Sequence, residues 1–447
     1  MTKKTLVQRI ATIVAAVAVT ACGSDNPDGP EEIEDIKGEM EELSPTESKK
    51  FLRDAAEEFM AKFQAADQRE IITLASYFEE TYGELDAPKE FEVEPTESRL
   101  LKDFFRGMKE AFSQGSPSRA GSAAIVYTYS LNADMFKGVY EPGSRRWTRT
   151  ESSNDVVFRF KDATGATCEV KAVVSATTSD GQVDYTDEGY EYGDYKVDDE
   201  KYVYKFRIPT DATVTVTCGG NTLVTARVVS QIDVDGHTMS VTSNVSAANI
   251  ESAVKVDGND SQVSSSTSLS VSGETLVTGQ ASVTGSRLCD YTAYRDMEDE
   301  DDAIAMFKTG TAVVSVLNKV RVDAEGTYNR SVYKAIENQD YDYSSQSEAE
   351  KAAGNAIDAL NDKIKAEVRY NNKETVQATV AWKYKLDDWH SSYNSYYWYN
   401  LDPVLKFKAD DTTYSIEEYF ENGFASVTDE WETLQRSYEK VWESVRK

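Results

Sequence analysis

The chain of 447 residues is poor in histidine and cysteine, with two and four of them respectively. It has no C-x-x-C pair and no Cys/His spacing of the kind that binds zinc. It also has no H-E-x-x-H, G-x-S-x-G or P-loop motif, and its histidines, His237 and His390, lie far apart in the chain. We therefore predict no cofactor and a non-enzymatic role. A pair of carboxylates that hydrolyses glycosides would leave no such motif, and no pair can be chosen among so many acids.

Positive charge is also scarce, because 48 Lys and Arg stand against 78 Asp and Glu, for a formal net charge of −30. Binding of nucleic acid needs clusters of Lys and Arg, so this balance argues against nucleic acid as a partner. It equally argues against electrostatic adhesion to anionic lipid. A strongly acidic chain of this length is typical of a well-solvated globular surface.

Long apolar runs are missing except for residues 10–19, and a membrane-spanning helix needs ~20 apolar residues. Lys3, Lys4 and Arg9 precede this run, and Val19-Thr20-Ala21-Cys22 ends it. A positive start, a short apolar stretch and small residues before a cleavage point make up a secretory signal peptide. We therefore predict that residues 1–21 are removed and that Cys22 becomes the first residue.

A cysteine at that position, preceded by Ala21, resembles the lipobox of bacterial lipoproteins. The resemblance implies acylation of Cys22 and attachment to the outer membrane. Residues 22–43 begin with Pro, Gly and acidic residues and are predicted to form a disordered tether. An acidic tether after the lipidated cysteine is similar to the export signal of surface lipoproteins in Bacteroidetes-type bacteria. This likeness implies a cell-surface location, with the periplasmic face as the alternative.

Once Cys22 is acylated, three cysteines are left, so at most one internal disulfide can form. Cys168 and Cys218 both lie in strand-like runs and can pair across neighbouring strands in an oxidising compartment. Two buried free thiols are the alternative.

Three helices are predicted in residues 44–115. Ser44 and Glu47 form a capping box around Pro45, and apolar residues then recur every four positions through Phe63. The second helix covers residues 71–82, and the third begins at Pro95.

Residues 122–288 change to a period of two, which predicts a long-stranded antiparallel sheet. Turns are expected at residues 220–221, 235–236, 257–258 and 272–273, with a bulge at 248–249. The inner positions of 263–271 and 277–283 are small, so either a helix packs closely there or a cavity for an apolar ligand remains. The second reading is similar in pattern to the half-barrel of periplasmic lipoprotein carriers.

Residues 290–447 are predicted to be mixed α+β, packed with the sheet. One strand is expected over 313–322, and two paired strands around Asn371-Asn372. The last helix carries apolar residues at near-heptad spacing from Val427 to Val445. At barely three heptads this stripe predicts packing onto its own domain, hence a monomer.

Two clusters of side chains are candidate sites. The densest aromatic cluster could stack on sugars or grip a protein, or could fold onto its own domain; it comprises Trp389, Tyr393, Tyr396, Tyr397, Trp398 and Tyr399. An acidic cluster could hold a hard cation, or could be a solvated hairpin tip; it comprises Asp184, Asp187, Glu188 and Asp194.

Taken together, the sequence predicts an α+β fold in which N-terminal helices pack on a long, curved antiparallel sheet. The predicted function is a membrane-anchored binding or scaffold module whose ligand is a protein, lipid or glycan. A carrier of hydrophobic ligands and a glycan binder or glycoside-active enzyme are the alternatives. The predicted segments are 1–21 (signal peptide), 22–43 (tether), 44–115 (helical), 122–288 (sheet) and 290–447 (α+β).

Overall fold

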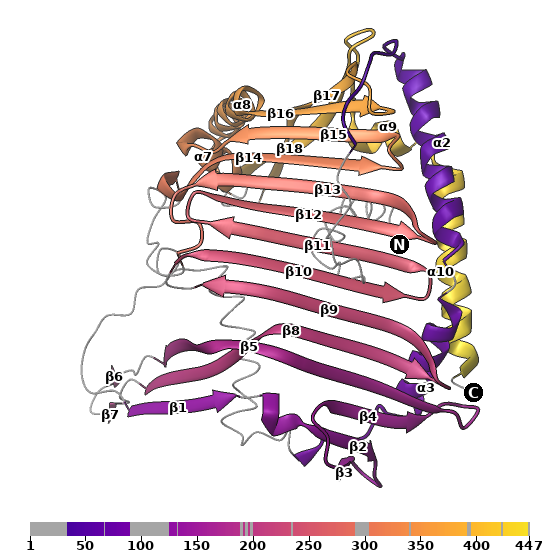
Figure 1. The fold of residues 1–447 in the computed structure, drawn as a ribbon. Coiled ribbons are helices and arrows are strands. Elements are labelled where there is room, and N and C mark those ends of the chain that lie inside the picture. The colour runs from indigo at the N-terminus through magenta and orange to yellow at the C-terminus, as the bar shows by residue number, and fades with distance from the viewer. Residues whose placement is uncertain are drawn as a thin grey trace.

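The computed structural model confirms the predicted α+β fold, a large curved antiparallel sheet with helices packed on it (Figure 1). It describes residues 34–445 apart from 67, 90–124, 132, 188–190, 193–194, 197–199, 234–235, 291–303, 339–340, 391–394 and 422. The predicted signal peptide, Cys22 and the third predicted helix lie outside the described residues. No helix among the described residues is long and apolar enough to cross a membrane.

Seventeen of the described strands belong to one sheet. Sixteen of them follow the spatial order β3-β2-β4-β5-β8-β9, then β10 to β19 in sequence, and β1 pairs with the first part of β8. Neighbours are antiparallel except β2 with β4 and β1 with β8. The sheet does not end at residue 288, because β14 to β19 of the C-terminal region continue it. The strands are β1 (Ile125–Leu131), β2 (Gly138–Pro142), β3 (Trp147–Glu151), β4 (Val156–Lys161), β5 (Thr167–Asp187), β8 (Glu200–Cys218), β9 (Asn221–Asp233), β10 (Thr238–Ala247), β11 (Ile250–Asn259), β12 (Gln262–Val271), β13 (Glu274–Gly285), β14 (Phe307–Val316), β15 (Val320–Thr327), β16 (Ile364–Tyr370), β17 (Val376–His390), β18 (Ser395–Phe407) and β19 (Thr413–Ser415). A separate two-stranded ladder joins β6 (Glu191–Tyr192) and β7 (Tyr195–Lys196).

The register gives the sheet one apolar and one polar face, since side chains alternate between faces along each strand. On the apolar face, directly opposed positions from β10 to β17 are Val241, Val256, Ser265, Ala281, Ala312, Ala324, Ala366 and Val380. The neighbouring row on the polar face, from β11 to β17, is Lys255, Ser266, Gln280, Val313, Asp323, Glu367 and Thr379. In this row Ser or Ala occupies the five positions from β12 to β16, with valines on either side, so the small inner residues continue beyond β13.

Three helices cover the apolar face at one end of the strands, which we call the α2 end. They are α2 (Pro45–Gln64), α3 (Arg69–Tyr82) and α10 (Ala425–Val445), and α2 and α10 run side by side across the strand ends (Figure 1). The Ser44–Glu47 capping box starts α2 as predicted. Phe59 and Phe63 then pack on Val277 of β13, and Trp431 of α10 stacks on Phe63. The stripe of α10 therefore packs within its own chain.

The remaining helices support the C-terminal strands. They are α7 (Arg330–Glu337), α8 (Gln346–Lys363) and α9 (Ile416–Glu421). Leu360 of α8 is 2% exposed and packs with Tyr399 of β18 and Trp382 of β17. This contact holds α8 against β17 and β18 beyond the first residue of β16.

The N-terminal segment, defined here as residues 34–43, lies against the turns at the α2 end, although it falls in the predicted tether. The backbone N–H of Lys37 donates to the carbonyl of Asn372 (2.9 Å). The N–H of Glu374 in turn donates to the carbonyl of Gly38 (2.8 Å). Among the described residues, ordered contacts of this segment therefore begin at residue 34.

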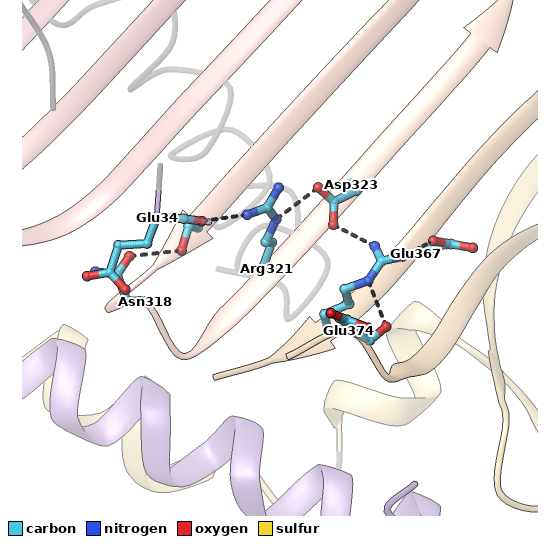
Figure 2. A network of polar contacts seen from close by, with 8 residues as sticks. Glu34, Asn318, Arg321, Asp323, Glu367 and Glu374 are labelled. Atoms are coloured by element: carbon cyan, nitrogen blue, oxygen red, sulfur yellow. Dashed lines mark hydrogen bonds and ion pairs between the residues drawn. The ribbon is translucent and has the colours of Figure 1, made fainter. Parts of the chain in front are cut away.

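A polar network on the polar face fixes the start of this segment (Figure 2). Arg321 Nη1 donates to the Glu34 carbonyl at 2.9 Å, and Arg321 Nε donates to Asp323 Oδ1 at 2.9 Å. Arg369 Nη1 donates to Asp323 Oδ2 at 2.7 Å and also pairs with Glu367. The side chains of Arg321 and Arg369 are 13% and 15% exposed, so this network is shielded from water more than most surface ion pairs.

Gln377 of β17 fixes the other end of the segment. Its side chain is fully buried, its Nε2 donates to the Glu41 carbonyl at 3.0 Å, and its Oε1 accepts from the Leu43 N–H at 2.7 Å. Both polar atoms of a buried amide are thus paired with the N-terminal segment, which is the arrangement that burial of an amide requires.

Replacing Gln377 with leucine should destabilise the protein by about 2 kcal/mol, because a backbone N–H and a carbonyl lose their buried partners. Hydrogen exchange of residues 37–43 should become faster, measured by mass spectrometry. Gln435→Leu on the exposed side of α10 is the control and should change neither quantity. Unchanged exchange in Gln377→Leu would show that the segment is held by other contacts.

Candidate functional site

The candidate site lies on the part of the β17–β18 hairpin that extends beyond the rest of the sheet. We call residues 381–390 and 395–403 the ribbon. Among the described residues, β16 pairs with β17 only up to Val380, and β19 pairs with β18 only from Val404. Between these limits the two strands pair with each other, and Tyr397 alone forms a bridge to Tyr343.

One face of the ribbon is packed against α7 and α8. Trp382, Leu386, Tyr399 and Leu401 lie in the cluster around Leu360. Asn361 of α8 fastens the backbone of Trp382, since Trp382 N–H donates to Asn361 Oδ1 (2.8 Å) and Asn361 Nδ2 donates to the Trp382 carbonyl (3.2 Å). Packing of this face against α7 and α8 therefore holds the ribbon in place.

The other face, the open face, presents four rows of opposed residues. From the tip inward they are Trp389 with Tyr396, Asp387 with Trp398, Lys385 with Asn400, and Lys383 with Asp402. None of the hydrophobic clusters formed by the described residues includes Trp389, Tyr396 or Trp398. The open face thus combines aromatic rings with polar groups outside any described core.

The rings at the tip form an ordered pair. The centroids of Trp389 and Tyr396 are 5.9 Å apart, with 19° between their planes, and Trp389 is 53% exposed. In the polar rows, Asn400 Nδ2 donates to Asp387 Oδ2 at 2.6 Å, and Lys385 Nζ lies 3.9 Å from Asp387 Oδ1. Asp387 is therefore fixed by an amide and lies near an ammonium group.

The predicted aromatic cluster is divided by the period of the strand. Trp389, Tyr396 and Trp398 belong to the open face, whereas Tyr397 and Tyr399 belong to the packed face, and Tyr393 lies outside the described residues. Tyr399 is a correction to the prediction, because it is 1% exposed and its hydroxyl donates to the Ala335 carbonyl at 3.4 Å. Burial raises the pKa of Tyr399 to about 12, so it is a neutral core residue.

The acidic cluster is not a loop along its whole length. Asp184 and Asp187 lie within β5, opposite Val203 and Glu200 of β8, so the two strands continue through that part of the cluster. Glu188 and Asp194 lie outside the described residues. The one group of potential metal ligands that the described residues bring together is Asp162 with Cys168 and Cys218.

Cys168 and Cys218 are directly opposed on β5 and β8, and the structure joins them by a disulfide. Sulfur atoms in a disulfide are not thiolates, so they leave Asp162 without partners for a metal ion. The bridge lies in the core under α3, with Cys168 fully buried.

Cys289 is the free cysteine among the described residues. Burial together with the nearby Asp260 carboxylate raises the pKa of the Cys289 thiol.

Two hollows among the described residues bear on the carrier hypothesis. A hollow of 260 Å³ on the polar face is lined mostly by polar side chains such as Lys255, Ser266 and Gln280. A hollow of 430 Å³ between α3 and α10 is lined by Arg69, Arg436, Lys440, Thr433, Ser437 and Val441. Neither is the apolar cavity that a carrier of hydrophobic ligands needs.

The open face of the ribbon and the position of the N-terminal segment are therefore the features that indicate a function. The sequence indicated the aromatic cluster, but only the register shows which of its rings lie outside the core.

Comparison with protein-family models, with curated proteins and with solved structures gave no match to this chain.

Proposed function

We propose that the protein is a lipoprotein of the outer membrane, anchored through acyl groups on Cys22, and that it acts as a non-enzymatic binding module on the cell surface. The observation that carries the binding role is the open face of the ribbon, which presents Trp389, Tyr396 and Trp398 outside the described core. The signal-peptide pattern that ends in Cys22 carries the anchor.

The position of the N-terminal segment supports this arrangement. Glu34 is held at the α2 end, where Asn318 Nδ2 donates to Glu34 Oε1 at 3.1 Å. Twelve residue steps lead from Cys22 to Glu34, so the two residues lie at most about 40 Å apart. An anchor on Cys22 would therefore keep Glu34 at the α2 end within about 40 Å of the bilayer surface.

The ribbon tip lies at the other end of the same strands. β17 starts beside the N-terminal segment at Val376 and ends at His390. Fourteen steps at about 3.3 Å carry the chain about 45 Å from the attachment end. An anchored body of this design presents Trp389 and Tyr396 away from its attachment point.

Labelling of whole cells tests this proposal. Asn400→Cys places a thiol at an exposed position on the open face, and we expect a membrane-impermeant maleimide to label it on intact cells. The unsubstituted chain, whose free thiol is the partly buried Cys289, is the control and should be labelled several-fold less. Labelling that occurs only after the outer membrane is permeabilised would contradict a surface location and support the periplasmic alternative.

A further inference from the structure

The rings on the open face have the geometry of a stacking surface. Trp389 and Tyr396 come from adjacent strands, face each other in register, and lie within 19° of parallel. The face of an aromatic ring is electron-rich and apolar, and it attracts weakly positive C–H groups. A pyranose ring offers such C–H groups on one side, whereas its hydroxyls point outward.

Polar groups lie in the rows next to these rings. The row next to the tip places Asp387 opposite Trp398, and Asn400 Nδ2 is bonded to Asp387 Oδ2 at 2.6 Å. A carboxylate accepts hydrogen bonds, and an amide both donates and accepts. The next row contributes Lys385, whose Nζ is 3.9 Å from Asp387 Oδ1. Successive rows are about 7 Å apart, so a row of two rings, a row of one ring and one carboxylate, and a polar row follow one another along the ribbon.

The packed face makes this surface rigid before any ligand arrives. Leu360, Trp382 and Tyr399 form a core behind it, and backbone bonds join Tyr343 to Tyr397 at 2.8 and 3.0 Å. Binding then costs little ordering of side chains, which matters for a small polar ligand that buries a limited area.

From this combination we propose that the open face of the ribbon binds a neutral carbohydrate, with pyranose rings stacked on Trp389 and Tyr396 and hydroxyls bonded to Asp387 and Asn400. This inference deepens the proposed binding role and rests on it, but it does not depend on the anchor.

The charge of the chain selects neutral sugars over charged ones. The open face itself carries Lys383 and Lys385 against Asp387 and Asp402, so its formal charges balance. The whole chain has a net charge of −30, so an anionic polysaccharide would be repelled. A peptide partner would need an apolar pocket for an anchor side chain. On the open face the described aromatic rows are instead interrupted by Asp387 and Lys385.

Affinity electrophoresis in native gels containing a soluble β-glucan, a xylan or a galactomannan tests the inference. The chain without its signal peptide and carrying Cys22→Ser is used, so that the anchor has no influence. At least one polysaccharide should retard the protein. Trp389→Ala should weaken that retardation at least tenfold, Tyr396→Ala should weaken it as well, and Trp389→Phe should retain most of it.

Tyr384→Ala is the matched control, because Tyr384 is an exposed ring on the same strand but on the other face of the ribbon. It should change binding by less than twofold, and unfolding curves should show that all variants are folded. No retardation by any of the three probes and no binding on an array of neutral glycans would overturn the inference, as would equal losses in Trp389→Ala and Tyr384→Ala. Binding of a peptide at Trp389 in place of sugar would overturn it too, yet it would leave the proposed binding role intact.

Discussion

Replacing Cys22 with serine is expected to move the protein from the membrane fraction to the soluble fraction. Each buried acyl methylene contributes ~0.8 kcal/mol, so a cysteine that carries several chains holds the protein durably. A serine at position 22 has no sulfur to form the thioether bond to a diacylglyceryl group, so the acyl groups are not attached.

Ultracentrifugation of lysed cells, followed by immunoblotting of pellet and supernatant, measures this effect. Cys289→Ser is the control, because it removes a thiol while leaving the signal region intact, and it should remain in the pellet. A Cys22→Ser protein that still sediments with membranes would contradict the acyl anchor.

Removing the Cys168–Cys218 disulfide should cost about 4 kcal/mol of the free energy of unfolding. The bridge closes a loop between residues 50 positions apart, and such a cross-link reduces the entropy of the unfolded chain. The bridge is also buried in the cluster that includes Tyr140, Trp147 and Phe160, so two alanines would leave unfilled volume there. The double variant Cys168→Ala/Cys218→Ala is therefore expected to show the largest loss of stability among our predictions.

Urea unfolding of the oxidised protein and of the double variant gives the difference directly. Cys289→Ala serves as the control and should change the midpoint much less. Alkylation of the native protein under denaturing, non-reducing conditions provides a second measure, because the bridge predicts a single reactive thiol among these three cysteines. Three alkylated thiols would contradict the disulfide.

Much of the fold follows from local patterns in the sequence. The Ser44–Glu47 capping box predicts the start of α2, because it satisfies two N–H groups at the helix end. The alternation of apolar and polar residues predicts the long strands and their two faces. The turn at 272–273 lies where it was predicted, and the turn predicted at 220–221 lies one residue earlier, at 219–220. Gly220 and Gly273 have positive φ in these turns.

Some turns could not be placed from the sequence. Asp257-Gly258 was predicted to be a turn but lies within β11, and the turn falls after Asn259. A side chain at Gly258 would meet Cys289 Sγ at 2.8 Å, so this glycine serves close packing. The predicted bulge at Ala248-Asn249 is instead the connection between β10 and β11, with Ala248 at φ 52°.

The strand predicted over 313–322 is two strands, β14 and β15, joined at Leu317 and Asn318. Both residues have positive φ, 54° and 53°. A leucine in the left-handed region gives no turn signal in a sequence, because that conformation is uncommon for it. Leu317 packs in the cluster with Leu276 and Val277 beneath α2, and this tertiary contact accompanies the turn.

The candidate site was predicted in outline only. Aromatic density marked residues 389–399, but the period of two alone does not say which face is covered. That depends on α8, which packs Leu360 onto Tyr399 and leaves Trp389 outside the core. The N-terminal segment was missed for a similar reason, since its partner Gln377 lies more than 330 residues along the chain.

The most direct test of the proposed anchor is the mass of the mature N-terminus, measured on protein extracted from membranes. We predict an N-terminal peptide that begins at Cys22 and carries the added mass of a diacylglyceryl group and an N-linked acyl chain. A mature peptide that begins elsewhere, or one in which Cys22 is unmodified, would contradict the anchored binding module proposed here.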